Sequence, residues 1–542
     1  MGGIVLTSRL PSDLAFIAPI IFGDTTLHDY EFDQDTRDHT FDPFLLLTTL
    51  EARSAVSECI LPLCDSAFPR KRKRRKDDEE RFMHTLRLVV ANALRASGHP
   101  TSRRVHYSRK AETYSGESVY YREWFRYTNL INAVDAMGAA GLLHLTTGDN
   151  DNWFTSFSKL PQSTFQASKG LLERLGDYGV TTSDAIKSAD APVVVLKEAD
   201  HKLMEYQPDD PAIRCLIESV RGYNEFIRQC DVWHDLSSGQ LAALHSKREK
   251  DGRARPPTNF NDIALRRVFN NADFGQGGRW FGGWWQTVPS EYRQFILIDK
   301  QRTVELDYSG FHIRGIYHLN GTDYRDDPYE IEPIVAAADA QGLDWESVRD
   351  SIKQLTNILI NAKQTDRIGK ISELTMPKGF KLPNRVYPLI MEKHKAINSV
   401  FRTGFGLPMM RMESDVCEGI LQEGKRKGIL VLPIHDSFVV QERHEGWLEE
   451  VMLSIYRSQF GFNPIIKKKE SEVLRDEEMT INKISPLKGN PLQDPSIGET
   501  VREDDRQPWS SETNNPVRNF FADQKERQLA HIWDRKLLVR DA

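Results

Sequence analysis

The sequence lacks the cysteine patterns of a disulfide-stapled domain or of a structural zinc site. Its five cysteines are spread over 542 residues, and no two of them form a C-x-x-C pair. They are Cys59, Cys64, Cys215, Cys230 and Cys417. Small disulfide scaffolds are dense in cysteine and zinc ribbons use closely spaced thiols, so both classes are disfavoured. The odd number and wide scatter favour a reducing compartment.

The sequence also has no apolar stretch that approaches the ~18 consecutive residues of a membrane-spanning helix. A short apolar run, residues 14–22, is interrupted by Pro19 and has no small-residue cleavage site after it, which disfavours a signal peptide. We therefore expect no membrane partner. We expect a cytoplasmic location, nucleoid-associated in a bacterium, with a nuclear location open in a eukaryote.

Several signatures of nucleotide and metal chemistry are absent. There is no G-x-x-x-x-G-K-[ST] loop, which disfavours a helicase or ATPase motor, and neither an H-E-x-x-H motif nor a zinc-deaminase signature occurs. Charge of one sign is also not in large excess, because 72 Lys and Arg against 78 Asp and Glu give 72 − 78 = −6. This balance excludes a histone-like neutraliser of phosphate but allows a local basic cleft.

One strongly basic run stands out at residues 70–76, where seven consecutive residues are Lys or Arg and four acidic residues follow. A run of like charges does not fold on itself. Three interpretations stay open: a solvated linker or helix entry, a phosphate-binding arm, and a nuclear address.

The region after this run has features of a nucleic-acid-binding domain. Residues 128–140 have the apolar spacing of a helix, Gly141 marks its end, and residues 142–145 are an apolar strand. Helix, glycine and strand in this order favour a winged helix-turn-helix. Arginines and tyrosines precede it and would suit phosphate contact and base stacking. They are Arg103, Arg104, Arg109, Arg122, Arg126, Tyr107, Tyr114, Tyr120, Tyr121 and Tyr127. A helical domain with an exposed basic face explains the same pattern.

Two carboxylates occupy similar places in two predicted strands. Residues 303–309 alternate between apolar and polar side chains and reach Asp307, after which residues 311–319 have helical spacing. Residues 428–440 are two apolar runs joined by His435-Asp436-Ser437, which predicts a β-hairpin with a carboxylate at its turn. If the two strands are neighbours, Asp307 and Asp436 converge. A pair of divalent ions ~3.5–4 Å apart requires carboxylates of this kind, and Mg²⁺ needs only one or two of them plus substrate phosphates.

A third segment supplies positive charge. Arg349, Lys353, Asn357 and Asn361 recur every four residues, so on a helix they form one stripe opposite an apolar face. Arg and Lys one turn apart suit a triphosphate. An aromatic and glycine-rich run, residues 277–285, is either a platform for nucleic-acid bases or a buried aromatic cluster.

Together these segments resemble family A (Pol I-like) DNA polymerases. Asp307-Tyr308-Ser309 with Phe311, Ile313, Arg314 and His318-Leu319 resembles motif A. Arg349-x-x-x-Lys353 resembles the start of motif B, and His435-Asp436 resembles motif C. Trp285-Gln286-Thr287-Val288-Pro289 with Arg293, and Leu407-Pro408-Met409 with Asp415, are similar to two further family segments. These pieces occur in family order over about 160 residues, from Arg279 to Val440.

The resemblance implies an α+β fold: a right-hand polymerase with an antiparallel palm sheet and helical fingers and thumb. It would follow a mainly helical N-terminal region for which a winged helix is one interpretation. The division that we expect is an N-terminal segment with the basic run (1–80), a helical or winged-helix-like candidate nucleic-acid-binding domain (81–200), a helical thumb-like or linker region (201–257), palm and fingers (258–484) and an irregular tail (485–542).

The resemblance also implies roles. Asp307 and Asp436 would be the catalytic residues and hold two Mg²⁺ ions, for which Mn²⁺ substitutes. The nucleotide would meet Arg349, Lys353, Asn357, His312 and Tyr308. Nucleic acid would meet Arg279, Gln286, Arg314 and His435. The implied partners are a DNA primer-template and deoxynucleoside triphosphates, and the implied reaction is attack of a primer 3′-hydroxyl on an α-phosphate.

The sequence departs from the family at several positions. His312 replaces a glutamate that helps to exclude a 2′-hydroxyl, Ser437 replaces an acidic residue, and His-Asp-Ser is instead the form in single-subunit phage RNA polymerases. Asn357 and Asn361 replace an aromatic residue and a tyrosine, and Met410 replaces a glutamine. Two alternatives therefore stay open: an enzyme of the same fold that uses ribonucleotides or needs no template, and a non-catalytic DNA-binding replication or defence protein with a remnant palm. Replication of a mobile element, repair and antiviral defence are not distinguished.

Overall fold

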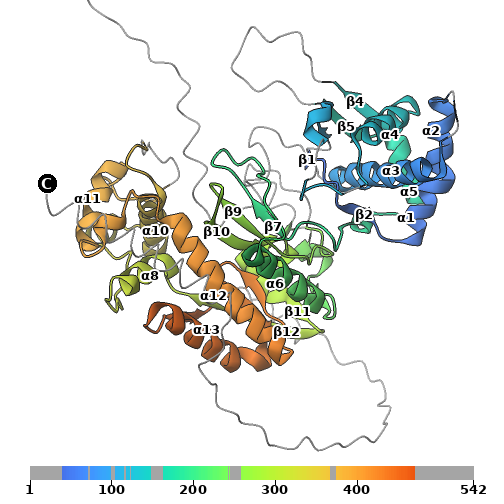
Figure 1. Cartoon of the computed structure of the whole chain (residues 1–542). Helices are drawn as coiled ribbons and strands as arrows, with labels where there is room; N and C mark the ends of the chain where they lie inside the picture. Colours follow the sequence, from blue (N-terminus) through green and yellow to red (C-terminus); the bar gives the residue numbers. More distant parts are fainter. Residues whose placement is uncertain are drawn as a thin grey trace, which may run out of the picture.

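The structure, a computed structural model, describes residues 39–469 except residues 71, 73, 99–103, 115–117, 123, 148–162, 242, 245–257 and 367–373. These residues form a mixed α+β fold of many helices and mostly antiparallel sheets. Two separate hydrophobic clusters divide them into a first unit that ends near Ala185 and a second unit that begins near Val193. Figure 1 shows the first unit, in blue to teal, to one side of the second. The predicted tail, 485–542, lies outside the described residues.

The first unit packs helices against a four-stranded sheet in the order β1-β3-β5-β4 and a separate pair, β2-β6. Its helices are α1 (Leu50–Ser54), η3 (Ala55–Ile60), α2 (Leu61–Ala67), α3 (Lys76–Ser97), α4 (Tyr127–Ala139) and α5 (Lys169–Asp177). Its strands are β1 (His39–Thr40), β2 (Leu45–Leu47), β3 (Arg104–Tyr107), β4 (Leu143–Thr146), β5 (Ser163–Ala167) and β6 (Ala185–Lys187). The predicted succession of helix, glycine and strand is confirmed, because α4 ends before Gly141 at φ +67° and β4 follows. The winged-helix interpretation stays a prediction.

The basic run leads straight into a helix. Helix α3 begins at Lys76, and the acidic residues that follow lie in its first turn, where they interact favourably with the helix dipole. Arg74 is not solvated as a free linker would be: its guanidinium lies 3.5 Å from the ring centre of Phe82 and pairs with Asp65 at 3.4 Å. Residues on both sides of position 80 share one hydrophobic cluster, so α3 crosses the boundary that we placed there. The rest of the predicted domain division stays a prediction.

The arginine and tyrosine set of the first unit is largely used within the protein. Tyr107 and Tyr120 are buried, and Arg109 donates to the Tyr107 hydroxyl at 2.8 Å and to both carboxylate oxygens of Asp135 at 2.8 and 2.9 Å. Arg122 pairs with Asp190 at 2.9 Å. These contacts stabilise the unit, and Arg103 lies outside the described residues.

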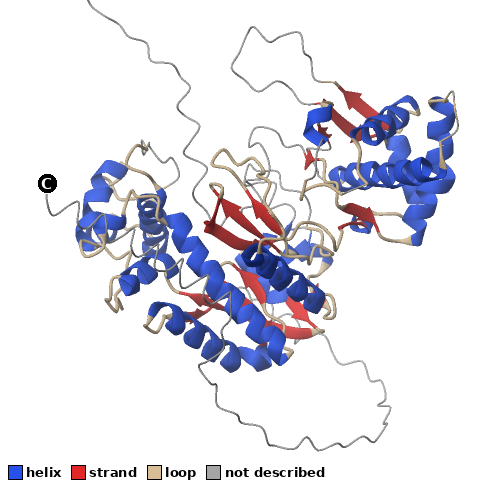
Figure 2. Cartoon of the chain, viewed as in Figure 1, coloured by secondary structure: helices blue, strands red, loops and turns tan. Residues whose placement is uncertain are grey.

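The second unit is built on a six-stranded sheet in the order β13-β14-β12-β11-β8, with β15 paired to β12. A three-stranded sheet, β10-β9-β7, lies beside it. The strands are β7 (Val194–Leu196), β8 (Val232–His234), β9 (Arg266–Asn270), β10 (Asp273–Phe281), β11 (Ile296–Ile298), β12 (Gln301–Tyr308), β13 (Leu432–Ile434), β14 (Ser437–Gln441) and β15 (Ile466–Lys468). Figure 2 shows these strands toward the middle of the unit, with helices around them.

Helices cover this unit. Those with defined bounds are α6 (Pro211–Ile227), α8 (Phe311–Leu319), α9 (Glu332–Ala340), α10 (Trp345–Asn361), α11 (Pro383–Lys393), α12 (Gly406–Lys427) and α13 (Glu445–Phe460). Short 3-10 helices in the two units are η4 (Ala111–Tyr114), η5 (Thr182–Asp184), η6 (Trp284–Thr287), η7 (Ser290–Phe295), η8 (Asn398–Val400) and η9 (Glu442–His444). The division of this unit into palm, fingers and thumb stays a prediction.

The alternation of β12 determines which side chains face the core. Val304, Leu306 and Tyr308 are buried, so Glu305 and Asp307 point to the opposite face. Gly310 at φ +66° then makes the turn into α8, as the sequence predicts.

The predicted hairpin is also confirmed. Strands β13 and β14 are antiparallel, and Ile434 pairs with Ser437, which leaves His435 and Asp436 as a two-residue turn. His435 has φ +60°, a left-handed conformation that a residue with a side chain adopts at a cost of ~1–3 kcal/mol. This conformation lies beside Asp436, the carboxylate that the sequence predicts to be catalytic.

Helix α10 has the two faces that its spacing predicts. Asp344 caps its start by accepting from the Ser347 N–H at 2.9 Å. Ile352, Leu355 and Leu359 are buried, whereas the stripe that begins with Arg349 and Lys353 is half-buried or exposed. The run at residues 277–285 is a buried aromatic cluster, since its four aromatic side chains are almost fully buried. These are Trp280, Phe281, Trp284 and Trp285.

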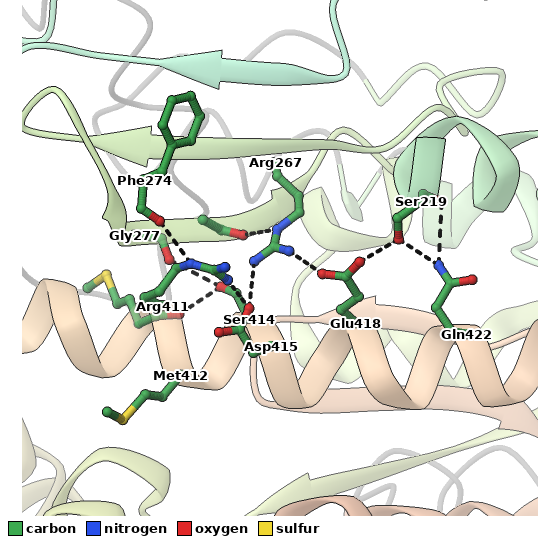
Figure 3. Close-up of polar contacts among 12 residues, drawn as sticks. Ser219, Arg267, Phe274, Gly277, Arg411, Met412, Ser414, Asp415, Glu418 and Gln422 are labelled. Atoms are coloured by element: carbon green, nitrogen blue, oxygen red, sulfur yellow. Dashed lines mark hydrogen bonds and ion pairs between the residues drawn. The ribbon is translucent and has the colours of Figure 1, made fainter. Parts of the chain in front are cut away.

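Helix α12 is tied to the β9–β10 hairpin by buried charges (Figure 3). Arg267 of β9 is fully buried and pairs with Glu418 and, at 3.2 Å, with Asp415, both on α12. Arg411 pairs with the same Asp415 and donates through Nε to the Phe274 carbonyl at 2.9 Å. These bonds determine where α12 lies above the strand that carries Arg279.

The two units are joined by a small set of polar contacts. The Tyr120 hydroxyl donates to the Met204 carbonyl at 2.9 Å and accepts from the Leu196 N–H at 3.0 Å. Arg95 of α3 pairs with Asp262 of the second unit. The first unit is therefore docked against the strand β7 side of the second.

Candidate active site

The two predicted catalytic aspartates are brought together by strand pairing. β12 and β14 are antiparallel neighbours, with Asp307 opposite Ser437, the residue after Asp436. The Tyr308 N–H donates to the Asp436 carbonyl at 3.1 Å, which holds the hairpin turn against the end of β12. The two carboxylates therefore lie at the same end of adjacent strands.

The electrostatics of this pair are unusual for carboxylates. Burial, and after it the charge of Asp436, raise the pKa of Asp307 to about 8, while the positive charges of Lys469 and Lys353 act in the opposite direction. Like charges close together disfavour ionisation of one another. A raised pKa of this origin is common at functional sites, where a cation or substrate relieves the repulsion.

The basic stripe of α10 faces this pair. The positive charge of Lys353 opposes the rise in the pKa of Asp307. Burial raises the pKa of the Tyr329 phenol, Lys353 and Arg349 act to lower it, and Asp436 acts to raise it, so all three charges lie near this side chain. Tyr329 is buried, and the Arg349 guanidinium lies 5.1 Å from its ring centre. Carboxylates and basic residues that are far apart in the sequence thus surround one buried aromatic residue.

Ser437, which departs from the family pattern, has a carboxylate partner. Its hydroxyl donates to Glu305 at 2.8 Å, and Arg293 and Lys469 pair with the same carboxylate at 3.0 and 2.7 Å. Glu305 lies on the same face of β12 as Asp307, two residues before it. An acidic group is therefore present beside the pair, although it comes from β12 instead of β14.

His312 also has a carboxylate partner. Its Nε2 lies 2.8 Å from Glu413 of α12, and Arg279 of β10 donates to both oxygens of Glu413 at 2.7 and 2.8 Å. Glu413 is 2% exposed. Burial opposes its ionisation, but the charge of Arg279 and the hydrogen bonds from His312 and Arg279 outweigh it and lower the pKa of Glu413 well below its usual range. The three side chains form one unit at the junction of three elements.

Three predicted site residues have internal partners. Gln286 is buried and donates to the Trp280 and Pro433 carbonyls, both at 2.9 Å. The Tyr308 hydroxyl donates to the Met452 carbonyl at 2.7 Å. Arg314 donates to three backbone carbonyls and holds the loop between α8 and α9. These contacts have a supporting role, and the nucleotide and nucleic-acid contacts predicted for the three residues stay predictions.

The remaining predicted residues lie around the pair. His435 is half-buried in the hairpin turn, with its ring 5.4 Å from that of Phe281. Asn357 is half-buried one turn after Lys353, and its carbonyl accepts from the Asn361 side chain at 2.9 Å. Their predicted roles are not tested by these contacts.

The donor set fits a divalent ion that is shared with substrate. No group of three or more His, Cys, Asp or Glu side chains in the described part of the chain is arranged to hold a metal. Asp307 and Asp436 make a pair, and Mg²⁺ is usually held by one or two carboxylates together with water and substrate phosphates. A divalent cation would also relieve the repulsion that raises the pKa of Asp307.

Some residues at the site were not predicted from the sequence. They are Glu305, Asp327, Tyr329, Glu413 and Lys469. Only Glu305 had a usable signal, since its spacing of two from Asp307 places both on one face of a strand. The others come from loops or helices whose approach to the site depends on tertiary packing.

Comparisons with known proteins give only a weak structural similarity. No protein-family model matches the sequence, and no curated protein matches it. Among solved structures, the chain is weakly similar to the POL domain of Pol1 from M. smegmatis in complex with DNA primer-template and dNTP, with a TM-score of 0.28 and 13% identity. The match covers 43% of this chain and 55% of that one, so it spans about half of the solved chain. Any function proposed for this protein therefore depends on its own site.

No helix in the described ranges combines the length and the apolar character that are required to cross a membrane.

Proposed function

We propose that this protein is a metal-dependent nucleotidyltransferase, a DNA-directed DNA polymerase that extends a primer 3′-hydroxyl with deoxynucleotides. The observation that carries the proposal is the placement of Asp307 and Asp436 at one end of adjacent strands, with the positive charge of Lys353 acting on Asp307. Two carboxylates facing a basic helix suit phosphoryl transfer, in which catalysis is mostly positioning and charge stabilisation.

Each part of the site has a task in this proposal. Asp307 and Asp436 would hold Mg²⁺ or Mn²⁺, which activates the attacking hydroxyl and stabilises the leaving group when bound. Arg349 and Lys353 would bind the triphosphate and place its α-phosphate. His312 would lie against the sugar, held by Glu413. The family A resemblance of the sequence agrees with these assignments.

A primer-extension assay tests the proposal. A labelled primer, with and without template, is offered dNTPs or NTPs with Mg²⁺ or Mn²⁺. The wild-type protein is compared with Asp307→Ala and Asp436→Asn, and Glu449→Gln on the exposed face of α13 is the matched control. We expect template-dependent extension with dNTPs.

Asp436→Asn should abolish extension and leave primer-template binding within a few fold, because the change removes a metal-binding charge and preserves the side-chain shape. Extension by this variant would contradict the metal assignment. Extension with NTPs alone, or without template, would favour the related enzyme classes over a DNA-directed DNA polymerase. If the wild-type protein binds DNA but extends nothing, it is a non-catalytic binding protein.

A further inference from the structure

The most specific unassigned feature near the site is the partner of Arg349. Asp327, in the loop between α8 and α9, accepts from Arg349 Nε at 2.7 Å and from Nη2 at 3.2 Å. A carboxylate that bonds these two nitrogens occupies one edge of the guanidinium. The second edge, Nη1 with the outer hydrogen of Nη2, has the same spacing and suits a second anion.

The second edge of Arg349 is not used by a described residue. No hydrogen bond joins Nη1 to any residue in the described part of the chain. The Arg349 side chain is 18% exposed, so a solute has access to it. The Tyr329 ring lies 5.1 Å from the guanidinium carbon and restricts its tilt. Arg349 is thus held on one edge and one face.

Asp327 is itself held in place on both sides. Before it, Arg314 donates to the Asp326 carbonyl at 2.9 Å. After it, His394 Nε2 lies 2.9 Å from the Pro328 carbonyl, and since a carbonyl only accepts, this nitrogen carries the proton. The Tyr329 N–H also donates to the Asp327 carboxylate at 2.9 Å. A carboxylate anchored in this way is suited to orient a cation.

We infer that Asp327 is a positioning residue for nucleotide binding: it holds one edge of Arg349 so that the other edge meets the phosphates of an incoming nucleoside triphosphate. The inference rests on the proposed function and extends it to a residue outside the segments that resemble known polymerases. It also gives Arg314 a task, since the backbone bonds of Arg314 keep the Asp327 loop in position. In the opposite role, Asp327 competes with phosphate for Arg349. That role predicts that removal of the Asp327 charge lowers the KM for dNTP, whereas the positioning role predicts that it raises this KM.

Steady-state extension with a primer-template and a varied dNTP concentration separates these roles. Asp327→Asn should raise the KM for dNTP about tenfold, equivalent to about 1.4 kcal/mol, with kcat within about threefold. The inhibition constant of inorganic pyrophosphate should rise by a similar factor, because the phosphates alone meet Arg349. Asp327→Glu keeps the charge but displaces the guanidinium, so its KM should also rise.

The matched control is Asp323→Asn in the same loop, where the carboxylate pairs with Arg325 at 2.8 Å and with His318 of α8 at 3.4 Å, and not with α10. It should leave KM within twofold. Thermal melting and primer-template affinity check that each variant folds and binds DNA. Because Asp327 is 30% exposed and lies in a loop, we expect the folded state to survive its substitution.

The outcomes distinguish two failures. If the wild-type protein extends no primer, the proposed function fails and this inference fails with it. If the wild-type protein extends primers and Asp327→Asn keeps its KM within twofold, only the inference fails. A lower KM in Asp327→Asn overturns the positioning role in favour of competition, and recovery of the wild-type KM in Asp327→Glu reduces the role to charge balance.

Discussion

Replacing Asp307 by asparagine should stabilise the protein in the absence of divalent metal. The pKa of Asp307 is raised from 3.8 to about 8 by burial and by the charge of Asp436. A carboxyl group with a raised pKa in the folded state favours folding below its unfolded pKa, and this contribution is lost as the pH rises to about 8. The destabilisation of the wild-type protein by this group therefore grows between about pH 4 and pH 8 and persists above pH 8, and the asparagine variant lacks it.

The size of this effect on the free energy of unfolding follows from the shift in the pKa of Asp307. At pH 7 the group is 7 − 3.8 = 3.2 pH units above its ordinary pKa, which corresponds to about 4 kcal/mol as an upper value at 1.36 kcal/mol per unit. Asp307 keeps some contact with solvent, so we expect about 1 to 3 kcal/mol. In a unit of this size that is a rise in Tm of about 2 to 10 °C.

The assay is thermal unfolding of the wild-type protein, Asp307→Asn and the exposed control Glu449→Gln between pH 5 and pH 8.5, in chelator and in Mn²⁺. The difference between Asp307→Asn and wild type should grow with pH in chelator. Mn²⁺ should raise the Tm of the wild-type protein more than that of the variant, because a ligand that binds the folded state stabilises it. A variant that is less stable than wild type at pH 8 in chelator, or a difference independent of pH, would show that ionised Asp307 does not destabilise the folded protein.

Two further predictions concern buried contacts. Glu413→Ala leaves Arg279 and His312 without their buried carboxylate and should cost about 3 to 5 kcal/mol in urea unfolding at pH 7; a cost under about 1 kcal/mol would contradict the ion pair. Because the pKa of Glu413 is depressed, this stabilisation is present above its ordinary pKa of 4.5 and is lost as the pH falls below it. Tyr120→Phe removes the hydroxyl that bonds Leu196 and Met204, and should lower stability by about 1 to 3 kcal/mol and speed proteolysis between the two units. Unchanged proteolysis would show that other contacts hold the units together.

The local pattern of side chains in the sequence was sufficient to predict several strands, turns and helices of the candidate site. The alternation before Asp307, the turn at Gly310, the hairpin around His435 and the two faces of α10 all depend on side-chain spacing or on turn residues within about 15 positions. Such signals are carried by neighbouring residues, so the sequence determines them almost alone. The order of these segments along the chain and their resemblance to family A polymerases could also be recognised in the sequence.

The partners of the candidate site residues depend on tertiary structure. Asp307 meets Asp436 because β12 pairs with β14, and Arg349 meets Asp327 because Arg314 and His394 hold a loop beside α10. No periodicity encodes such contacts, since each depends on strand pairing and packing between distant segments. The sequence alone is therefore enough to predict on which strands and helices the proposed catalytic residues lie. Which charges face one another depends on the tertiary structure, because packing buries Asp307 beside Asp436, which raises its pKa, and brings Arg279 and His312 to Glu413, which lowers the pKa of Glu413.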